Sequence, residues 1–168
     1  SFSLPGELTA NYSRGASTME FLGGNLEDAD LADTVYVTGT TMLYRNTVVT
    51  DQFEHNLHDI IDVWEDAIDV GEWGIRPERM AEAAREANEM YPNKRLVIHF
   101  IQPHIPFIGD YGREQFGDID GSIWRKQRRG QLDANDEDLW QAYMENLHMV
   151  LPTVRNLLTE MPGKSVVT

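Results

Sequence analysis

Residues Lys94–Asp110, KRLVIHFIQPHIPFIGD, are the stretch from which the fold of this chain can be predicted. The nearly continuous apolar run Leu96–Ile101 is too short for a helix bounded in this way, so it predicts a strand that is buried on both faces. Pro103 and Pro106 end this strand, because each fixes φ and lacks an N–H. His104 is therefore expected on a stiff turn at the end of a parallel strand, where open α/β sheets bind their ligands.

The length of the chain, 168 residues, is enough to bury one hydrophobic core. We therefore expect a single α/β domain over residues 1–168. The chain begins at Ser1 rather than at a methionine, and it ends on the apolar run Ser165–Thr168. These ends lead us to expect that the chain is a fragment of a longer protein.

The composition is strongly acidic, with 28 acidic and 14 basic side chains and a net charge of −14. Such a surface repels nucleic acid and anionic lipid, so neither is an expected partner, and no apolar run reaches the roughly 18 residues of a membrane span. The preference for arginine over lysine favours the cytoplasm of a halophilic archaeon; the alternative is an ordinary acidic mesophilic protein. Cysteine is absent, which excludes disulfides, thiol nucleophiles and thiolate metal sites.

Two elements are predicted in the amino-terminal part of the chain. Ser17 and Glu20 have the spacing of a capping box, which predicts a short helix over residues 18–22 that ends at the two following glycines. The compact β-branched run Thr34–Thr38 predicts a second parallel strand.

Two further helices are predicted before the histidine-bearing strand. Apolar residues at helical spacing predict a helix over residues 54–69; they are Leu57, Ile60, Ile61, Trp64 and Ile68. A second helix is predicted from Pro77 to about Pro92, because proline is favoured in the first turn of a helix and ends one later. Its expected buried stripe consists of Met80, Ala83, Ala84, Ala87 and Met90.

The carboxyl-terminal part combines a glycine-rich stretch with the longest predicted helix. Residues 109–133 predict a long surface excursion. The helix is capped by Asn135 or Asp136, is kinked at Pro152 and precedes a predicted strand at Lys164–Thr168. Its expected buried stripe consists of Trp140, Tyr143, Met144, Leu147, Val150, Leu151, Val154, Leu157, Leu158 and Met161. Together the elements predict part of a three-layer α/β/α sandwich with a mainly parallel sheet.

The residues His99–Phe107, HFIQPHIPF, carry a family resemblance. They resemble the strand-to-loop motif of the sulfatase-like branch of the alkaline phosphatase superfamily, in which a buried strand ends in Pro-His-x-Pro and an aromatic residue. The long helix and the strand Lys164–Thr168 are similar to the segment that leads, in this family, into an Asp-His-Gly metal motif. The resemblance covers about residues 34–168 in element order, and that motif would begin just past the last residue.

The resemblance implies an alkaline-phosphatase-like fold and a hydrolase of sulfate or phosphate esters that uses one or two divalent metal ions. His104 matches the histidine that contacts the charged oxygens or the leaving group of a small anionic ester. The alternative is a structural histidine satisfied by loop carbonyls. No complete metal site is visible in the sequence, so the chain alone is expected to be inactive, with the metal bound only in the full-length protein.

Ser17 and Thr18 are the candidate nucleophiles, because a hydroxyl at the amino end of a helix lies beside free N–H groups that can hold an oxyanion. The family's usual signature, Cys or Ser followed by Pro-Ser-Arg, is absent, and Arg14 precedes the hydroxyls. Capping of the helix is the favoured role of these residues, and one residue can do both.

A basic cluster interrupts the acidic sequence, and Arg125 and Arg128 are its candidate substrate-binding residues. The cluster also includes Lys126 and Arg129. The favoured alternative is a solvated surface cluster paired with Asp118, Asp120 or Asp133.

The remaining histidines and aspartates favour structural roles. His99 lies inside the predicted strand and is expected to be a satisfied core histidine. His55 and His58 are three residues apart, which on a helix would make a metal pair, but a solvated helix face is favoured. Three nearby aspartates are interpreted as acidic surface; they are Asp28, Asp30 and Asp33.

The hypothesis that competes with a hydrolase is a non-catalytic, acidic α/β interaction module. A partial sheet leaves the edge of one strand unpaired, and such an edge can pair with another chain. A homo-oligomer formed through an exposed sheet edge is therefore considered for either function.

Overall fold

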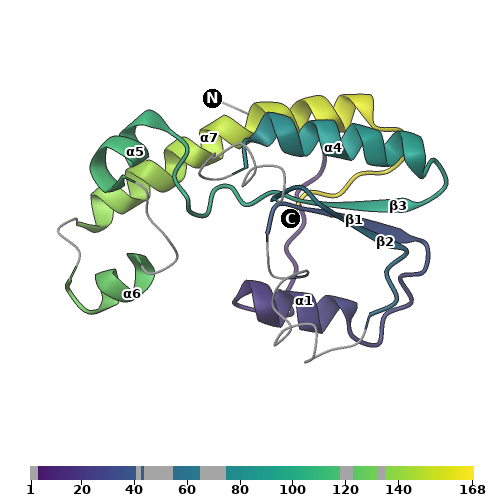
Figure 1. Ribbon diagram of the computed structural model, residues 1–168, viewed down its shortest axis with the longest axis horizontal. Helices are drawn as coiled ribbons and strands as arrows, with labels where there is room; N and C mark the ends of the chain where they lie inside the picture. Colours follow the sequence, from purple (N-terminus) through teal and green to yellow (C-terminus); the bar gives the residue numbers. More distant parts are fainter. Residues whose placement is uncertain (1–3, 41–42, 44–54, 65–74, 118–122, 132–134) are drawn as a thin grey trace.

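The computed structural model describes residues 4–40, 43, 55–64, 75–117, 123–131 and 135–168, and Figure 1 shows how its elements are arranged. The strands in these ranges are β1 (Thr34–Thr38), β2 (Asp59–Asp62) and β3 (Arg95–His99). The helices in the same ranges are α1 (Thr18–Leu26), α4 (Pro77–Met90), α5 (Asp110–Phe116), α6 (Ile123–Arg128) and α7 (Asp136–Glu160).

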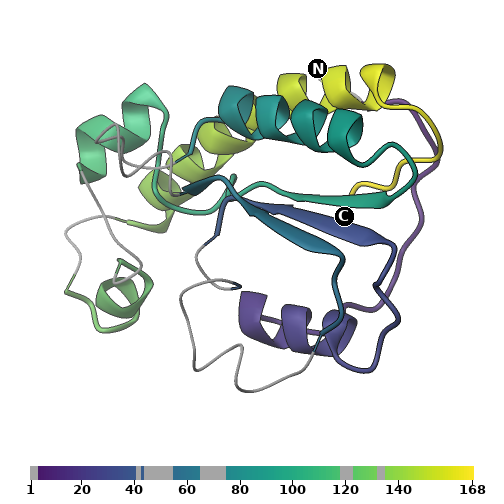
Figure 2. The same cartoon turned by 45° about the vertical axis from the view of Figure 1, so that its right-hand side comes forward.

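The three strands form one parallel sheet in the order β2-β1-β3. Every residue of β1 is buried, which agrees with its central position. Helix α1 lies on one face of the sheet, and α4 and α7 lie on the other (Figures 1 and 2). The predicted α/β class, with a parallel sheet between two helical layers, is confirmed.

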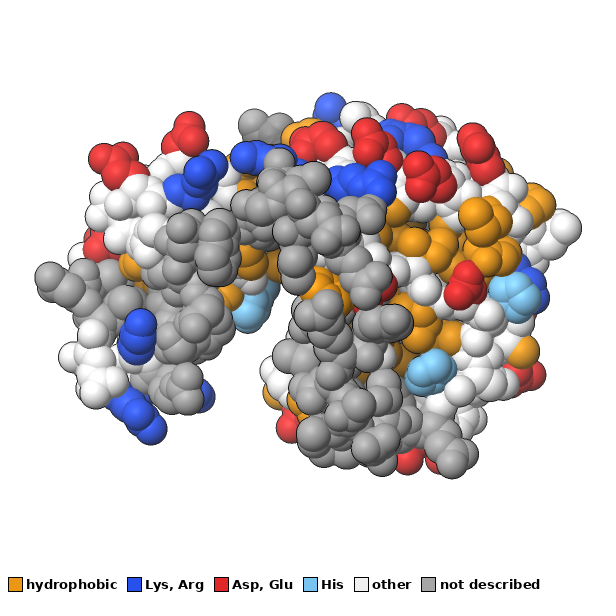
Figure 3. All heavy atoms as spheres, in the orientation of Figure 1, with side chains coloured by type: hydrophobic (Ala, Val, Ile, Leu, Met, Phe, Trp, Pro, Cys, Tyr) orange, Lys and Arg blue, Asp and Glu red, His pale blue; other side chains and the backbone are white. Residues whose placement is uncertain are grey.

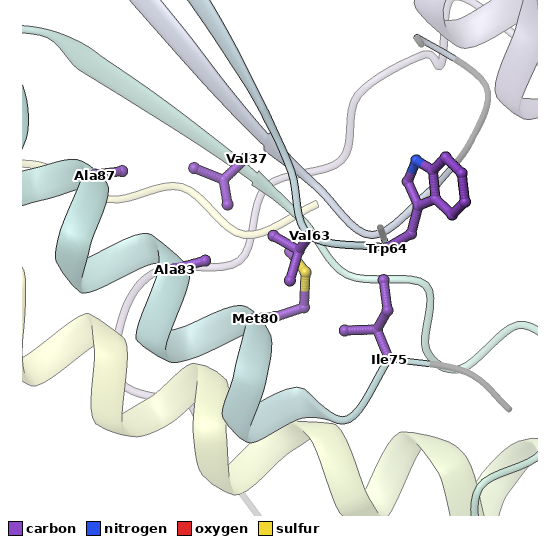
Figure 4. Close-up of a cluster of buried hydrophobic side chains, with 7 residues drawn as sticks. All are labelled: Val37, Val63, Trp64, Ile75, Met80, Ala83 and Ala87. Atoms are coloured by element: carbon purple, nitrogen blue, oxygen red, sulfur yellow. The ribbon is translucent and has the colours of Figure 1, made fainter. Parts of the chain in front are cut away.

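Each face of the sheet has its own hydrophobic core. The core on the α4 side is drawn in Figure 4 and consists of Val37, Val63, Trp64, Ile75, Met80, Ala83 and Ala87. The core on the α1 side consists of Leu22, Leu26, Tyr36 and Leu43. The neighbours Tyr36 and Val37 therefore point to opposite cores, because side chains alternate across a strand.

The predicted helix over residues 54–69 is wrong at residues 55–62, because residues 55–58 are irregular and Asp59–Asp62 form β2, whereas Trp64 is helical. Ile60 and Ile61 fit helical spacing, but β-branched residues also suit a strand. In the sheet Ile60 packs on the α1 core and Ile61 on the α4 core, so the strand partly buries both side chains. Residues 54 and 65–69, which include Ile68, lie outside the described residues.

Strand β3 differs from its prediction in length and in burial. It ends at His99 rather than at Ile101. It lies at an edge of the described sheet, and one of its two faces is only partly covered. Val97 is 39% exposed, because the side chains of α1 pack on β1 and β2 rather than on β3. On the opposite face, Leu96 and Ile98 pack against the α4 core.

Helix α1 is longer than predicted, because it continues through both glycines to Leu26. Ser17 is its N-cap, as predicted: the hydroxyl accepts a hydrogen bond from the backbone N–H of Glu20 at 3.4 Å. Leu22 and Leu26 are both buried against the sheet. This burial offsets the cost of about 1 kcal/mol that each glycine adds in a helix.

Helices α4 and α7 confirm the two strongest helix predictions. Helix α7 has 25 residues, is continuous through Pro152 and is capped by reciprocal hydrogen bonds between Asn135 and Asp138. The predicted buried stripes are wrong at two positions, since Met90 is 66% exposed and Trp140 is 62% exposed. None of the helices in the described ranges is long and apolar enough to cross a membrane.

Two predictions for the last third of the chain are corrected. Residues 109–133, expected to be irregular, include α5 and α6. Residues Lys164–Thr168 form no strand, and Val166 and Val167 remain exposed. The reason is that a β-branched run becomes a strand only when its backbone joins a ladder, and this segment joins none in the described sheet.

Candidate functional site

The carboxyl ends of the three strands meet at one edge of the sheet, because the strands are parallel. Thr38 at the end of β1 pairs with Asp62 at the end of β2 and with His99 at the end of β3. The chain that leaves β3 at this edge runs to α5 and carries the Pro-His-x-Pro sequence of residues 103–106.

The side chain of His104 is exposed on this connection. Its backbone N–H donates to the carbonyl of Ile101 at 3.0 Å, which closes the turn. Its Nδ1 lies 3.0 Å from the carbonyl oxygen of Ile105. Since a carbonyl oxygen only accepts, this hydrogen bond places a proton on Nδ1, and Nε2 donates only when the ring takes up a second proton.

The turn is held from the middle of α7 by Asn146, whose side chain is completely buried. The Oδ1 atom accepts a hydrogen bond from the backbone N–H of Ile108 at 2.9 Å. The Nδ2 atom donates toward three carbonyl oxygens of the turn: Pro106 at 3.1 Å, His104 at 3.2 Å and Pro103 at 3.4 Å. Both X–Pro peptide bonds in the turn, before Pro103 and before Pro106, are cis.

Asn146 was not among the predicted site residues. The sequence feature that could have identified it is its place inside the apolar stripe of α7: Tyr143 and Val150 lie three and four residues away, and Leu147 is adjacent. A buried amide is costly unless it is hydrogen bonded, so a polar residue within an apolar stripe indicates a specific partner.

Gln102 anchors the start of the same connection. Its side chain is only 6% exposed, and Nε2 donates to the carbonyl oxygen of Ile75 at 2.8 Å, just before α4. In the part of the chain that the structure describes, its Oε1 has no hydrogen-bond partner. The connection is therefore fixed to Ile75, just before α4, at one end and to α7 at the other.

His99 is a half-buried histidine with a hydrogen-bond partner, as predicted. Its Nδ1 lies 3.0 Å from the hydroxyl of Tyr36, and the two rings meet edge to face. Burial lowers the pKa of His99 below its usual 6.5, because the charged ring loses its hydration. This neutral, sheet-bound ring differs from the exposed ring of His104.

The candidate nucleophiles lie on another element. Ser17 is exposed at the amino end of α1, and Thr18 is the half-buried first residue of that helix. The hydrogen bonds of Ser17 stay within the first turn of α1, so the structure does not join it to the His104 turn. Capping, the favoured role in the sequence analysis, is the role that the geometry shows for Ser17.

The basic cluster lies on and just after α6, which stands apart from the sheet (Figures 1 and 2). Gln127 of α6 donates to Asp136 at 2.6 Å, so α6 lies beside the first turn of α7 rather than at the sheet edge. The side chains of Lys126, Arg128 and Arg129 are exposed. Figure 3 shows basic side chains on this part of the surface.

The second substrate-binding candidate, Arg125, belongs to α6, but its side chain is outside the described part of the chain. The proposed acidic partners of the cluster, Asp118, Asp120 and Asp133, also lie outside the described residues. The structure thus does not bring Arg128 together with His104.

The histidine pair proposed on a helix is not on a helix. Residues 55–58 precede β2; the ring of His58 meets Tyr91 edge to face at 5.4 Å. Asp33 is exposed but paired: Nη2 of Arg95 lies 2.6 Å from its Oδ1, and this hydrogen bond lowers the pKa of the Asp33 carboxyl.

Within the described ranges, no three side chains of His, Asp or Glu lie close enough to hold a metal ion. These residues therefore do not by themselves fit the divalent metal that the family resemblance implies.

A hollow of about 600 Å³ lies along the exposed side of α7, and Trp140 and Tyr111 contribute to its wall. His104 does not line it, so this hollow is a different surface from the one at the carboxyl ends of the strands.

No family model, no curated protein and no solved structure matches this chain.

Proposed function

We propose that this chain is part of a hydrolase of sulfate or phosphate esters, in which the imidazole of His104 binds a charged oxygen of a small anionic ester. The observation that supports this proposal is the exposed imidazole on a held turn past the carboxyl end of β3. Ligands of open parallel sheets bind at this edge. The resemblance of HFIQPHIPF to the sulfatase-like motif supports sulfate or phosphate esters as the substrate class.

The contact between Nδ1 and the carbonyl of Ile105 gives the ring its chemical role. It orients the imidazole, and a ligand at Nε2 would meet an acceptor in the neutral ring and a donor in the protonated ring. A protonated imidazole hydrogen bonds strongly to an anionic oxygen, because the interaction is charge-assisted. Such a donor stabilises the charge that develops when an ester bond breaks.

The proposal assigns the divalent metal to the full-length protein, with ligands that include residues outside the described ranges. The described residues do not form a metal site. Ser17 and Thr18 remain nucleophile candidates at the end of α1, and Arg125 and Arg128 remain candidates for binding the anionic group.

The test uses the full-length protein with p-nitrophenyl sulfate and p-nitrophenyl phosphate, each with Mg²⁺, Mn²⁺, Ca²⁺ or Zn²⁺. We expect His104→Gln to lower kcat/KM by about 10²-fold, the usual effect of removing one charge-stabilising donor. The matched control is His148→Gln, because His148 is also an exposed histidine but lies on α7. Full activity of the His104 variant would refute the role of His104. Metal-stimulated hydrolysis by residues 1–168 alone would refute the expectation that this chain is inactive.

The second candidate function is an acidic interaction module, and the exposed edge of β3 favours it. Val97 is 39% exposed on this strand, which lies at the edge of the described sheet. A module of this kind is expected to self-associate or to bind a partner strand through the edge, and a lysine at such an edge blocks pairing. Val97→Lys should then convert an oligomer to a monomer in sedimentation experiments. A wild-type chain that stays monomeric at all concentrations would exclude a homo-oligomer through this edge.

A further inference from the structure

We infer that Asn146 is a positioning residue, which holds the turn after β3 in the shape that presents the His104 imidazole to an anionic ligand. This inference rests on the proposed function of His104. Asn146 itself lies inside the protein and touches no ligand, because its side chain is completely buried.

The hydrogen bonds of Asn146 use almost all of its capacity. Its one acceptor oxygen receives the N–H of Ile108 at 2.9 Å, and its amide nitrogen faces the carbonyls of Pro106, His104 and Pro103 within 3.4 Å. The amide has two N–H groups for these three carbonyls. One side chain of α7 therefore fixes the backbone on both sides of His104.

The sequence of the turn explains why an outside donor is needed. Residues 103–108 follow the end of β3, so the sheet ladder does not satisfy their carbonyls. Pro103 and Pro106 have no N–H, which removes two of the local donors that a turn would otherwise use. The amide of Asn146 supplies donors for these carbonyls, so the turn depends on Asn146 for its shape.

The neighbouring residue of α7 extends the same support. Glu145 accepts hydrogen bonds from the backbone N–H groups of Tyr111 at 3.2 Å and Gly112 at 3.1 Å, at the start of α5. Glu145 thus fixes where the connection ends, whereas Asn146 fixes the part that bears the histidine. This division makes Asn146 the residue whose loss should act through His104.

The test is Asn146→Asp, which keeps the size of the side chain and an acceptor for Ile108 but removes both donors. Asn156→Asp is the matched control, because Asn156 is an exposed asparagine on the same helix and the charge change is the same. Binding of inorganic sulfate and phosphate is followed by isothermal titration calorimetry, which also measures variants without His104, and through the imidazole NMR signals of His104 where that residue is present. We expect binding at least about tenfold weaker in the Asn146 variant and unchanged in the control.

A double-mutant cycle with His104→Gln separates positioning from general damage. If Asn146 acts through His104, Asn146→Asp causes no further loss of anion binding in the His104→Gln background. An equal loss in both backgrounds, or no loss in the wild-type background, would overturn the inference. If the aspartate variant does not fold, Asn146→Ser replaces it in the same cycle, because serine keeps one donor.

Failure of the proposed function has a different signature. If the wild-type chain binds neither anion at His104, the hydrolase proposal fails. The positioning role is then tested separately, by the order parameter of the His104 ring nitrogens from ¹⁵N relaxation. We expect this order to fall in the Asn146 variant and not in the Asn156 control. Unchanged order in the Asn146 variant would reject the positioning role.

Discussion

The hydroxyl of Tyr36 on β1 lies 3.0 Å from Nδ1 of His99 on β3, and their rings meet edge to face with centroids 6.0 Å apart. Burial raises the pKa of Tyr36 to about 12 and lowers the pKa of His99, because both charged forms lose hydration. The pair is therefore neutral in the folded protein around neutral pH, and it ties the last residue of β3 to the central strand.

His99 should make the free energy of unfolding fall in mildly acidic solution. In the unfolded chain the ring takes up a proton at its ordinary pKa of 6.5, whereas the folded chain resists protonation until a lower pH. Between the folded pKa of His99 and pH 6.5 the unfolded state thus binds more protons, so stability from this group is complete above about pH 6.5 and declines as the pH falls through that range. Urea unfolding between pH 5 and pH 8 should show a smaller decline for His99→Gln than for the wild type.

The matched control for this experiment is His148→Gln, which removes an exposed histidine from α7. The acid decline of this variant shows how much of any change follows from the loss of a histidine elsewhere in the chain. Equal acid declines in the His99 variant and the wild type would show that His99 is protonated as easily in the folded chain as in the unfolded chain.

Two methionines of α4 should respond very differently to truncation. Met80 is completely buried between β1, Val63 and Ile75, whereas Met90 at the end of the same helix is 66% exposed. Met80→Ala should lower the free energy of unfolding by about 2–5 kcal/mol, because it removes buried apolar surface and leaves a cavity. Met90→Ala should change it by less than about 0.5 kcal/mol. Chemical denaturation of both variants measures the difference, and similar effects would contradict the described packing of α4.

The fold could be predicted where a sequence pattern is long or has unambiguous ends. Helix α4 has a proline in its first turn, and α7 keeps an apolar stripe over 25 residues. Strand β2 could not be predicted, because four residues with two central isoleucines satisfy both helical and strand periodicity. The edge position of β3 also has no local signal, since it depends on which strands pair with each other in the sheet.

The site was predictable only in its local part. Pro103 and Pro106 bracket His104 in the sequence, so the stiff turn follows from neighbouring residues. Asn146 could not be assigned to this turn, because its partners are about 40 residues away and belong to another element. The separation of α6 from the sheet edge likewise depends on tertiary structure, whereas the sequence showed only that basic residues gather there.

Gly112 on α5 should not tolerate a side chain. A Cβ atom at this position would lie 2.5 Å from Cβ of Phe107 and 3.3 Å from Cβ of Ala142, in the contact between α5 and α7. Gly112→Ala should therefore cost about 1–3 kcal/mol of folding free energy, despite the higher helix propensity of alanine. The control is Gln115→Ala, at an exposed position of the same helix. A melting temperature equal to that of the control would show that α5 can move away from α7 without cost.

The acidic surface should make the chain more stable in concentrated salt. At a net charge of −14 the exposed carboxylates repel one another, and salt screens this repulsion. We expect the melting temperature to rise by several degrees between about 0.1 M and 2 M KCl, since about 1 kcal/mol corresponds to about 2–4 °C for a domain of this size. Glu86→Gln with Glu89→Gln, at two exposed positions of α4, reduces the net charge from −14 to −12. This double variant should melt higher at low salt and gain less from KCl. If KCl raised the melting temperature of both proteins equally, the salt effect would come from strengthened apolar burial and not from screening of charge.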